Sequence, residues 1–315
     1  MNRAQRASAG ISTMPELPDI LTYLDALHPR IVGHPLERVR IGNPFLVRTP
    51  EPPIAAVEGR TVTGLRRLGK RIVLEVDGGL FVVIHLMIAG RLRWRERGFA
   101  IPGKVGLAAF DFPTGTLLVT EAGSKRRASV HVVRGEDGLE PHVRGGLEVL
   151  EADLPAFAGR LVAENHTLKR ALTDPHIFSG IGNAYSDEIL HAAKLSPMKL
   201  TSSLGDQEVR RLYEATQRTL RLWIDRLREE AKGAFPERVT AFREDMAVHG
   251  RYRKPCPACG APIQRIVYAR NESNYCATCQ TEGRLLSDRA LSRLLRDDWP
   301  KTLDALEERK RRGKA

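Results

Sequence analysis

Four cysteines, arranged as two Cys-x-x-Cys pairs, constrain this chain more than any other feature of its sequence. The pairs are Cys256/Cys259 and Cys276/Cys279, sixteen residues lie between them, and the 315 residues include no further cysteine. Four thiolates at this spacing suit a tetrahedral zinc ion. Two disulfides are the alternative, but without an export signal we expect a reducing compartment, where such pairs bind metal. The pattern predicts one structural Zn²⁺ ion.

The positive charge of the chain indicates a polyanionic partner. The formal net charge is +12 and the isoelectric point is about 9.9, and an excess of this size supplies the phosphate-binding term of nucleic-acid affinity. Basic runs are also often only solvated faces, and Glu308–Lys314 is open to that interpretation. The longest apolar stretch, Leu80–Ala89, contains His85 and falls short of the roughly 18 residues of a membrane helix. We therefore expect no membrane partner.

The region from Val39 to Val133 is rich in short β-type runs separated by turn residues such as Asp77–Gly79. This spacing is typical of an antiparallel sandwich or barrel. The runs are Val62–Leu65, Arg71–Val76, Leu80–Leu86, Arg91–Arg95, Leu107–Phe112, Thr116–Thr120 and Ser129–Val133.

Helical periodicity dominates after about Leu154. Apolar residues three and four apart predict helices at Leu168–Leu172, Ala184–Lys194 and Asp206–Lys232. A short helix is also expected at Ile20–Leu27, and a basic helix at Asp288–Arg312 beyond the zinc segment.

Pro15 and Glu16 carry the most specific chemistry in the chain. They stand in Met14-Pro15-Glu16-Leu17-Pro18. A proline at the start of a mature chain is a secondary amine, which attacks an aldehyde-like sugar carbon and forms an iminium ion. Glu16 can then act as an acid or base on the same sugar. The alternative is that the two prolines only bend the chain before a helix.

Two further segments could hold phosphate groups. Residues 178–188 place Gly180 and Gly182 before a predicted helix, where backbone N–H groups and the Asn183 amide could face an anion. The same turn could be a plain connection between helices. Lys70 precedes a predicted strand and is either a phosphate ligand or a solvated edge residue. His85, His131, His166 and His249 form no ligand-spaced set, so we interpret them as ordinary polar or core positions.

Taken together, these segments resemble the formamidopyrimidine-DNA glycosylase and endonuclease VIII family. Four landmarks occur in the family's order. They are the amino-terminal Met14–Pro18 segment, Lys70 before a strand, Gly180–Tyr185 as a helix-two-turn-helix, and a zinc finger led by Val248–Arg251. The resemblance covers about residues 14–281 and implies an α+β protein. Its parts are an N-terminal antiparallel β-sandwich, a helical domain with the helix-two-turn-helix, and a C-terminal four-cysteine zinc finger.

The resemblance implies a bifunctional DNA glycosylase and AP lyase of base excision repair. Such an enzyme extrudes a damaged nucleotide from duplex DNA. Pro15 would attack C1′ of the sugar, Glu16 would transfer a proton, and β- and δ-elimination would cut the strand. Lys70 and Asn183 would hold the flanking phosphates. The zinc ion would be structural, because four thiolates leave no open coordination position.

Two segments depart from the family's usual pattern for filling the gap left in the duplex. Ile88 stands where a methionine wedge is usual, with Met87 beside it. Ala128 replaces the usual aromatic after Arg126 and Arg127, and alanine cannot intercalate. Arg126 is still expected to probe the opposite base.

Three further departures concern the zinc hairpin, the segment after Glu16 and the N-terminal extension. The zinc-hairpin arginine is expected at Arg270, one residue before its usual place, which Asn271 occupies. Asp19 replaces the usual glutamate. While residues 1–13 remain attached through Met14, the Pro15 nitrogen is a tertiary amide, so we expect translation to begin at Met14 and the methionine to be removed.

These expectations divide the chain into five segments: an extension at 1–13, a catalytic helix and sandwich at 14–150, a helical DNA-binding domain at 151–250, a zinc finger at 251–283 and a basic tail at 284–315. We expect a monomer that acts on damaged double-stranded DNA in the cytoplasm, associated with the nucleoid if the source is bacterial. Two alternatives stay open: a specialised glycosylase for bulky or crosslinked adducts, and a non-enzymatic zinc-ribbon protein that binds DNA.

Overall fold

The computed structural model describes residues 14–123, 125–237, 239, 243–268, 271–286, 300–303, 305 and 308. These residues form two compact units. The first takes its residues from Met1–Arg144 and Trp223–Ala241, and the second from Gly145–Leu222 and Phe242–Ala315. Helix α5 (Asp206–Ala231) therefore contributes residues to both units. The predicted five-segment division stays a prediction.

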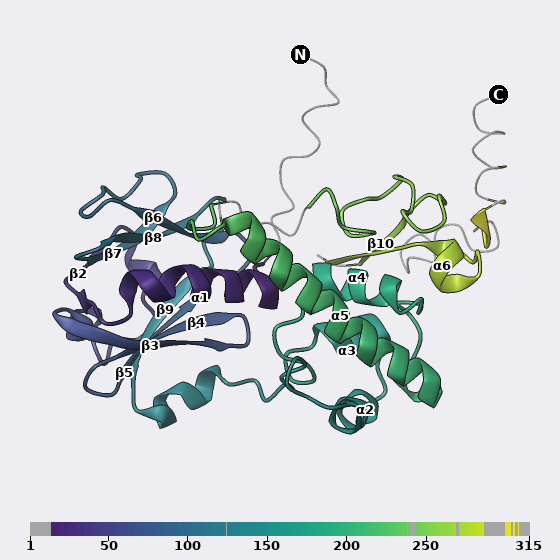
Figure 1. Cartoon of the computed structure of the whole chain (residues 1–315), viewed down its shortest axis with the longest axis horizontal. Helices are drawn as coiled ribbons and strands as arrows, with labels where there is room; N and C mark the ends of the chain where they lie inside the picture. The colour runs from purple at the N-terminus through teal and green to yellow at the C-terminus, as the bar shows by residue number, and fades with distance from the viewer. Residues whose placement is uncertain are drawn as a thin grey trace, which may run out of the picture. The chain divides into compact units, whose positions relative to one another are not determined.

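The first unit contains two antiparallel sheets (Figure 1), as the fold class predicted. One sheet has the strand order β1-β3-β4-β5-β9 and the other β2-β7-β8-β6. The strands are β1 (Pro35–Leu36), β2 (Arg38–Ile41), β3 (Arg60–Leu68), β4 (Arg71–Val76), β5 (Leu80–His85), β6 (Gly90–Arg95), β7 (Gly106–Phe112), β8 (Gly115–Glu121) and β9 (Ser129–Arg134). Two short 3-10 helices, η2 (Pro44–Leu46) and η3 (Ile54–Val57), lie between β2 and β3, and a third, η4 (Glu136–His142), follows β9.

Alternation of side chains builds a shared core for this unit. In β4, Ile72, Leu74 and Val76 belong to the main core, whereas Val73 packs in a smaller cluster on the opposite face of its sheet. Helix α1 (Leu17–Ile31) adds its buried face to the main core. Burying one large apolar side chain completely stabilises the fold by about 1.5–3 kcal/mol. The contributing residues of α1 include Ile20, Tyr23, Leu27 and Ile31.

The turn between β4 and β5 confirms the sequence prediction for residues 77–79. Gly78 and Gly79 have φ of +80° and +69°, the left-handed conformation that glycine adopts most readily. The turn sets the pairing Val76↔Leu80, and from there Arg71 is placed opposite His85.

Helices form most of the second unit. They are α2 (Leu154–Val162), α3 (Leu168–Thr173), α4 (Asn183–Ala192) and the first part of α5, with the 3-10 helix η5 (Thr201–Ser203). Asp153 caps α2, because its side chain accepts a hydrogen bond of 2.9 Å from the Ala156 N–H. The predicted helices at 168–172, 184–194 and 206–232 therefore occur, with small differences at their ends.

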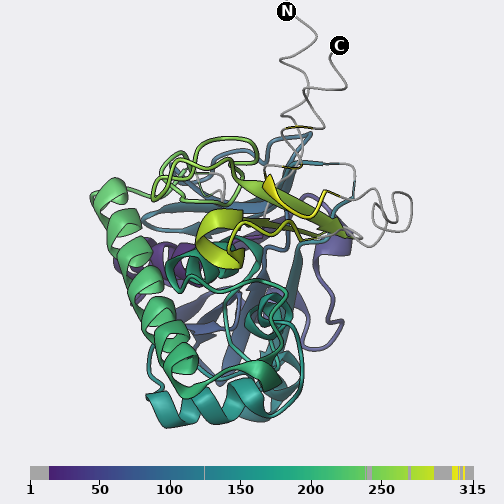
Figure 2. The same cartoon turned by 90° about the vertical axis from the view of Figure 1, so that its right-hand side faces the viewer.

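The zinc-finger part of this unit consists of a hairpin and a short helix, drawn in yellow-green in Figure 2. Strands β10 (Gln264–Tyr268) and β11 (Asn271–Tyr275) pair antiparallel, and α6 (Ala277–Thr281) follows. Most of the predicted helix at Asp288–Arg312 lies outside the described residues. Among the helices that the structure describes, none has the length and apolar character needed to span a bilayer.

Candidate active site and zinc site

Pro15 and Glu16 lie immediately before α1, and both are buried. Glu16 precedes the helix, and its backbone N–H donates a hydrogen bond of 2.9 Å to the Asp19 carboxylate. This contact satisfies one of the N–H groups that a helix start leaves unpaired. The positive end of the helix dipole also favours carboxylates at this position. The backbone of Glu16 is therefore held in place by the start of the helix.

Lys70 lies in the tight turn between β3 and β4. Gly69 precedes it with φ of +61°, and β4 begins at Arg71. The Lys70 side chain is half-buried. Burial, together with the charges of Arg71 and Lys70, lowers the pKa of His85 to about 3, so His85 is neutral at pH 7. No local pattern indicated that His85 stands among these cations, because the pairing of β4 with β5 brings it there.

Ile88 lies in the turn between β5 and β6, and 42% of its surface is exposed. Arg91 stabilises this turn, because one of its guanidinium nitrogens donates a hydrogen bond of 3.1 Å to the Ile88 carbonyl. Met87 adopts φ of +53°, unusual for a side chain with a Cβ. Ile88 is thus the apolar side chain that this turn exposes most.

Arg126 is exposed, and it donates a hydrogen bond of 2.7 Å to the Lys104 carbonyl. Ala128 instead lies in the main core and is 4% exposed. The buried Glu121 carboxylate fixes the backbone of Arg127 and Ala128, because it accepts hydrogen bonds from their N–H groups at 2.9–3.0 Å. Ala128 therefore anchors this loop and does not project from it.

Asn183 is the first residue of α4 and is half-buried. Gly180 before it has φ of +81°. The Asn183 carbonyl accepts a hydrogen bond of 2.7 Å from the buried Lys169 ammonium. Lys169 also contacts Asp187 at 2.5 Å. The start of α4 is therefore fixed by Lys169 on α3, which no sequence pattern indicated.

Asp187 lies at the centre of a buried polar network. Its carboxylate accepts hydrogen bonds from Asn274 N–H at 3.0 Å and Ser273 Oγ at 3.2 Å, and it contacts His249 Nδ1 at 2.9 Å. Burial by itself raises its pKa, but the charge of Lys169 and the hydrogen bond with His249 outweigh burial and lower it. Asp187 is therefore an anion that ties α4 to β11.

Glu188, the next residue on α4, holds the segment that leads to the zinc finger. Its carboxylate accepts hydrogen bonds from the N–H groups of Ala247, Val248 and His249 at 2.7–2.9 Å. His249 is thus part of a specific network, and its interpretation as an ordinary polar or core position was incomplete. Neither Glu188 nor His249 could be paired from the sequence, because about sixty residues separate them.

The four cysteine sulfurs converge on one point. All four Sγ atoms lie within 4.8 Å of one another. The Cys259–Cys276 and Cys256–Cys279 sulfurs are 3.4 and 3.9 Å apart. A tetrahedral zinc ion with Zn–S bonds of about 2.3 Å needs sulfurs about 3.8 Å apart, so the donor set fits. The site holds one structural zinc ion, as predicted.

The surroundings of the sulfurs also suit a metal. The Nε2 atom of His191 lies 3.3 Å from the Cys256 sulfur, where a neutral imidazole can donate to a thiolate. Burial lowers the pKa of His191, which keeps it neutral. Arg270, the predicted phosphate ligand of this hairpin, lies outside the described residues; Asn271 pairs with Tyr268 at the end of the ladder.

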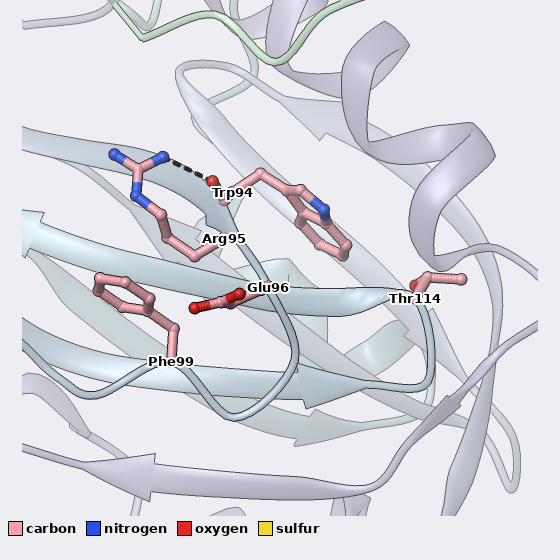
Figure 3. A pocket seen from close by; sticks show the side chains of 5 residues that line it. All are labelled: Trp94, Arg95, Glu96, Phe99 and Thr114. Carbon is pink, nitrogen blue, oxygen red and sulfur yellow. Dashed lines mark hydrogen bonds between the residues drawn. The ribbon is translucent and has the colours of Figure 1, made fainter.

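A separate pocket of about 420 Å³ lies in the first unit (Figure 3). It is lined by Trp94, Arg95, Glu96, Phe99 and Thr114. The Trp94 ring stacks on Phe112, and Arg95 is held by Glu237 at 2.6 Å. None of the predicted site residues lines this pocket.

Three family models match the chain in sequence order. The formamidopyrimidine-DNA glycosylase N-terminal domain matches residues 14–133, the H2TH domain of the same glycosylase matches 146–231, and the zinc finger found in FPG and IleRS matches 253–281. A formamidopyrimidine-DNA glycosylase of Thermus thermophilus is 32% identical over 279 residues, which cover 86% of this chain and 100% of that protein. That of Moorella thermoacetica is 31% identical over 271 residues, 80% of this chain and 94% of that protein.

Solved structures agree with the sequence matches. The crystal structure of the MutM (Fpg) protein of Thermus thermophilus has a TM-score of 0.70 at 32% identity and covers 84% of this chain and 98% of that one. The complex of Lactococcus lactis Fpg with DNA containing FAPY-dG has a TM-score of 0.75 at 24% identity, covering 84% and 100%, and it supports the fold.

A β-sandwich, a helix-two-turn-helix and a four-cysteine zinc finger in this order define a DNA glycosylase of base excision repair with AP lyase activity. The chain belongs to the formamidopyrimidine-DNA glycosylase family.

Proposed function

We propose that Pro15 is the nucleophile of this enzyme and Glu16 its proton donor and acceptor. The observation that carries the proposal is the position of the two residues: they are buried immediately before α1, and the contact with Asp19 fixes the backbone of Glu16. Both lie inside the matched N-terminal family domain. A nucleophile held in one orientation avoids the entropic cost of finding its target.

The reaction follows from the chemistry of a secondary amine. The Pro15 nitrogen bonds to C1′ of the extruded nucleotide, the bond from C1′ to the base breaks, and the base leaves with a proton. Glu16 protonates the sugar oxygen as the ring opens, which gives an iminium ion. The iminium acidifies C2′–H, so loss of that proton expels the 3′ phosphate, and a second elimination expels the 5′ phosphate.

This chemistry requires a free nitrogen on Pro15. An attached residue 14 would turn it into a tertiary amide with no lone pair for attack. We propose that the active form begins at Pro15, after removal of Met14. The match to the N-terminal family domain begins at residue 14, which supports this start.

Five further residues would hold the DNA. Lys70 and Asn183 would bind the phosphates that flank the extruded nucleotide, and Arg270 would bind a phosphate from the zinc hairpin. The exposed Ile88 would fill the gap in the duplex, and the exposed Arg126 would probe the opposite base. The enzyme would act as a monomer in the bacterial cytoplasm, which agrees with the bacterial source of the named relatives.

One observation favours a second candidate, a specialised glycosylase for bulky or crosslinked adducts. The loop after Arg126 turns Ala128 into the core, where it is 4% exposed. A loop without an intercalating aromatic leaves more room beside the extruded nucleotide. The named relatives are formamidopyrimidine-DNA glycosylases, so ring-opened and oxidised purines are the first lesions to assay, with bulky adducts beside them.

Reductive trapping tests the chemistry. The protein that begins at Pro15 is incubated with duplex containing an abasic site, and borohydride is added. We expect a covalent protein–DNA adduct, which a matched protein that retains Met14 does not form. Glu16→Gln should bind the same duplex but yield little strand cleavage. Equal adduct yield with residue 14 attached would show that Pro15 is not the nucleophile.

A further inference from the structure

Arg253, between His249 and the first zinc ligand, has an unusual backbone conformation. Its φ is +69°, a region that residues with a Cβ rarely adopt. Backbone hydrogen bonds enforce it, because Arg253 N–H donates to the Ile263 carbonyl and Ile263 N–H donates to the Lys254 carbonyl, each at 2.9 Å. Glycine would adopt this conformation with less strain. Compared with glycine, an arginine at this position therefore costs conformational free energy.

The Arg253 side chain stacks on an aromatic ring. Its guanidinium carbon lies 5.1 Å from the centre of the Tyr252 ring, and that of Arg265 lies 4.6 Å from the same centre. Arg265 also faces Glu272 at 3.4 Å, so its charge is partly balanced. Arg253 is exposed, and no carboxylate pairs with it within the described part of the chain.

Stacking on Tyr252 prepares Arg253 to bind an anion. A guanidinium that lies over a ring keeps the N–H groups at its edge free to donate. Stacking already restricts the rotamers of the Arg253 side chain, so less conformational entropy is lost when a ligand binds. Two parallel N–H donors match the oxygens of one phosphate group. Arg251 and Lys254 add positive charge within the same four residues, so the local field favours a polyanion.

We propose that Arg253, oriented by Tyr252, binds a backbone phosphate of the DNA duplex and gives the zinc-finger domain an anchor besides its hairpin tip. The partner rests on the proposed function, which makes duplex DNA the substrate. A phosphate contact carries no sequence or lesion information, so the anchor acts equally on damaged and undamaged DNA.

The substitution Arg253→Gly separates binding from folding. It removes the cation and suits the observed φ, so the free energy of unfolding should stay the same or rise. Loss of one phosphate contact lowers the slope of log affinity against log salt by about 0.9, which is roughly an eightfold weaker affinity at about 0.1 M salt. The dissociation constant is measured on an undamaged duplex and on one with an abasic-site analogue, at several salt concentrations.

Lys194 offers a matched control. It is an exposed cation in the same unit with φ of +54°, two residues after the end of α4. Lys194→Gly removes the same charge and relieves the same backbone conformation. No aromatic ring of the described residues orients Lys194, so the affinity of this variant for DNA should change less than about twofold. Tyr252→Phe should keep the affinity, because the ring remains, whereas Tyr252→Leu should weaken it by an intermediate factor.

Two results would overturn the proposal: wild-type affinity and salt slope in Arg253→Gly, or an equal loss in Lys194→Gly. Arg253→Gln keeps a polar side chain with a Cβ at this position and removes the positive charge, so it separates the loss of charge from the change to glycine. It should lose affinity like the glycine variant. Failure of the lyase chemistry would look different, since borohydride would then trap no adduct although Arg253→Gly still bound DNA more weakly than wild type.

Discussion

The two units hold their functional residues by different means. In the first unit, one apolar core includes residues of α1 and of both sheets. Pro15 lies before α1, Lys70 in the turn between β3 and β4, and Ile88 in the turn between β5 and β6. In the second, buried charges and four thiolates position Asn183 and the hairpin. Apolar packing tolerates changes of shape, whereas a buried ion pair tolerates no loss of one partner. The second unit should therefore respond more sharply to metal removal and to single polar substitutions.

Zinc removal should have the largest effect and should spare the first unit. In zinc-finger peptides the metal contributes about 10–16 kcal/mol, because the site does not exist in the unfolded chain. After chelation, amide hydrogens of β10, β11 and α6 should exchange freely, and DNA affinity should fall. Hydrogen exchange read by mass spectrometry checks both. Protection of the hairpin that survives chelation would contradict a structural role for the metal.

Loss of the buried Lys169 charge should come second. Lys169→Met leaves the Asp187 carboxylate buried without its cation, which costs about 3–5 kcal/mol of stability. Urea unfolding of the variant measures this loss. Lys199→Met is the control, because Lys199 pairs with Glu208 at 2.6 Å near the surface of the same unit, and such a pair contributes about 0–1 kcal/mol. Equal losses in the two variants would refute the central place of Asp187.

Mild acid should destabilise the first unit through His85. Its pKa is about 3 in the folded protein and 6.5 ordinarily, so between these pH values the unfolded chain binds more protons. Stability is therefore greatest above about pH 6.5 and falls as the pH drops. At pH 5 the loss amounts to about 2 kcal/mol for a fully shifted group.

The variant His85→Gln removes the contribution of His85 to the pH dependence of stability. Its stability should change less between pH 7 and pH 5 than that of the wild type, by an amount up to about 2 kcal/mol. Thermal or urea unfolding at the two pH values measures the difference. The same pH dependence in variant and wild type would show that another group causes it.

The cap of α1 should give the smallest change in stability and a larger one in activity. Asp19→Ala removes the acceptor for the Glu16 N–H, which should cost about 1 kcal/mol. Because the same contact fixes Glu16, the rate of borohydride trapping should fall by more than the stability loss explains. Asp19→Asn keeps an acceptor and should retain most of the rate; a rate equal to wild type in Asp19→Ala would count against this positioning.

Local patterns predicted the parts of the molecule that depend on near neighbours. Short β-type runs between turn residues located the principal strands, Asp77–Gly79 located a hairpin turn, and the glycines before Asn183 located the start of α4. The spacing of the cysteines, together with the expected reducing compartment, was sufficient for the zinc ligands, because each Cys-x-x-Cys pair places two sulfurs on one turn. Strands β1 and β2 were too short to show a period.

Contacts between distant residues could not be predicted. Glu188 binds N–H groups about sixty residues away, and the pairing of β4 with β5 places His85 among cations. Ala128 was identified as a missing aromatic, but its burial depends on Glu121, seven residues earlier. Such pairings leave no periodic signal in one sequence, since any carboxylate could in principle accept these hydrogen bonds. The roles of Pro15 and Glu16 stay predictions until the chemistry is tested.

The most direct test locates the covalent bond to DNA. Protein that begins at Pro15 is trapped with borohydride on an abasic duplex, the adduct is digested, and the modified peptide is sequenced by mass spectrometry. We expect the reduced sugar to be bonded through C1′ to the nitrogen of Pro15 and to no other residue. A sugar attached to a lysine side chain, or full trapping by protein whose Pro15 is acylated, would contradict it.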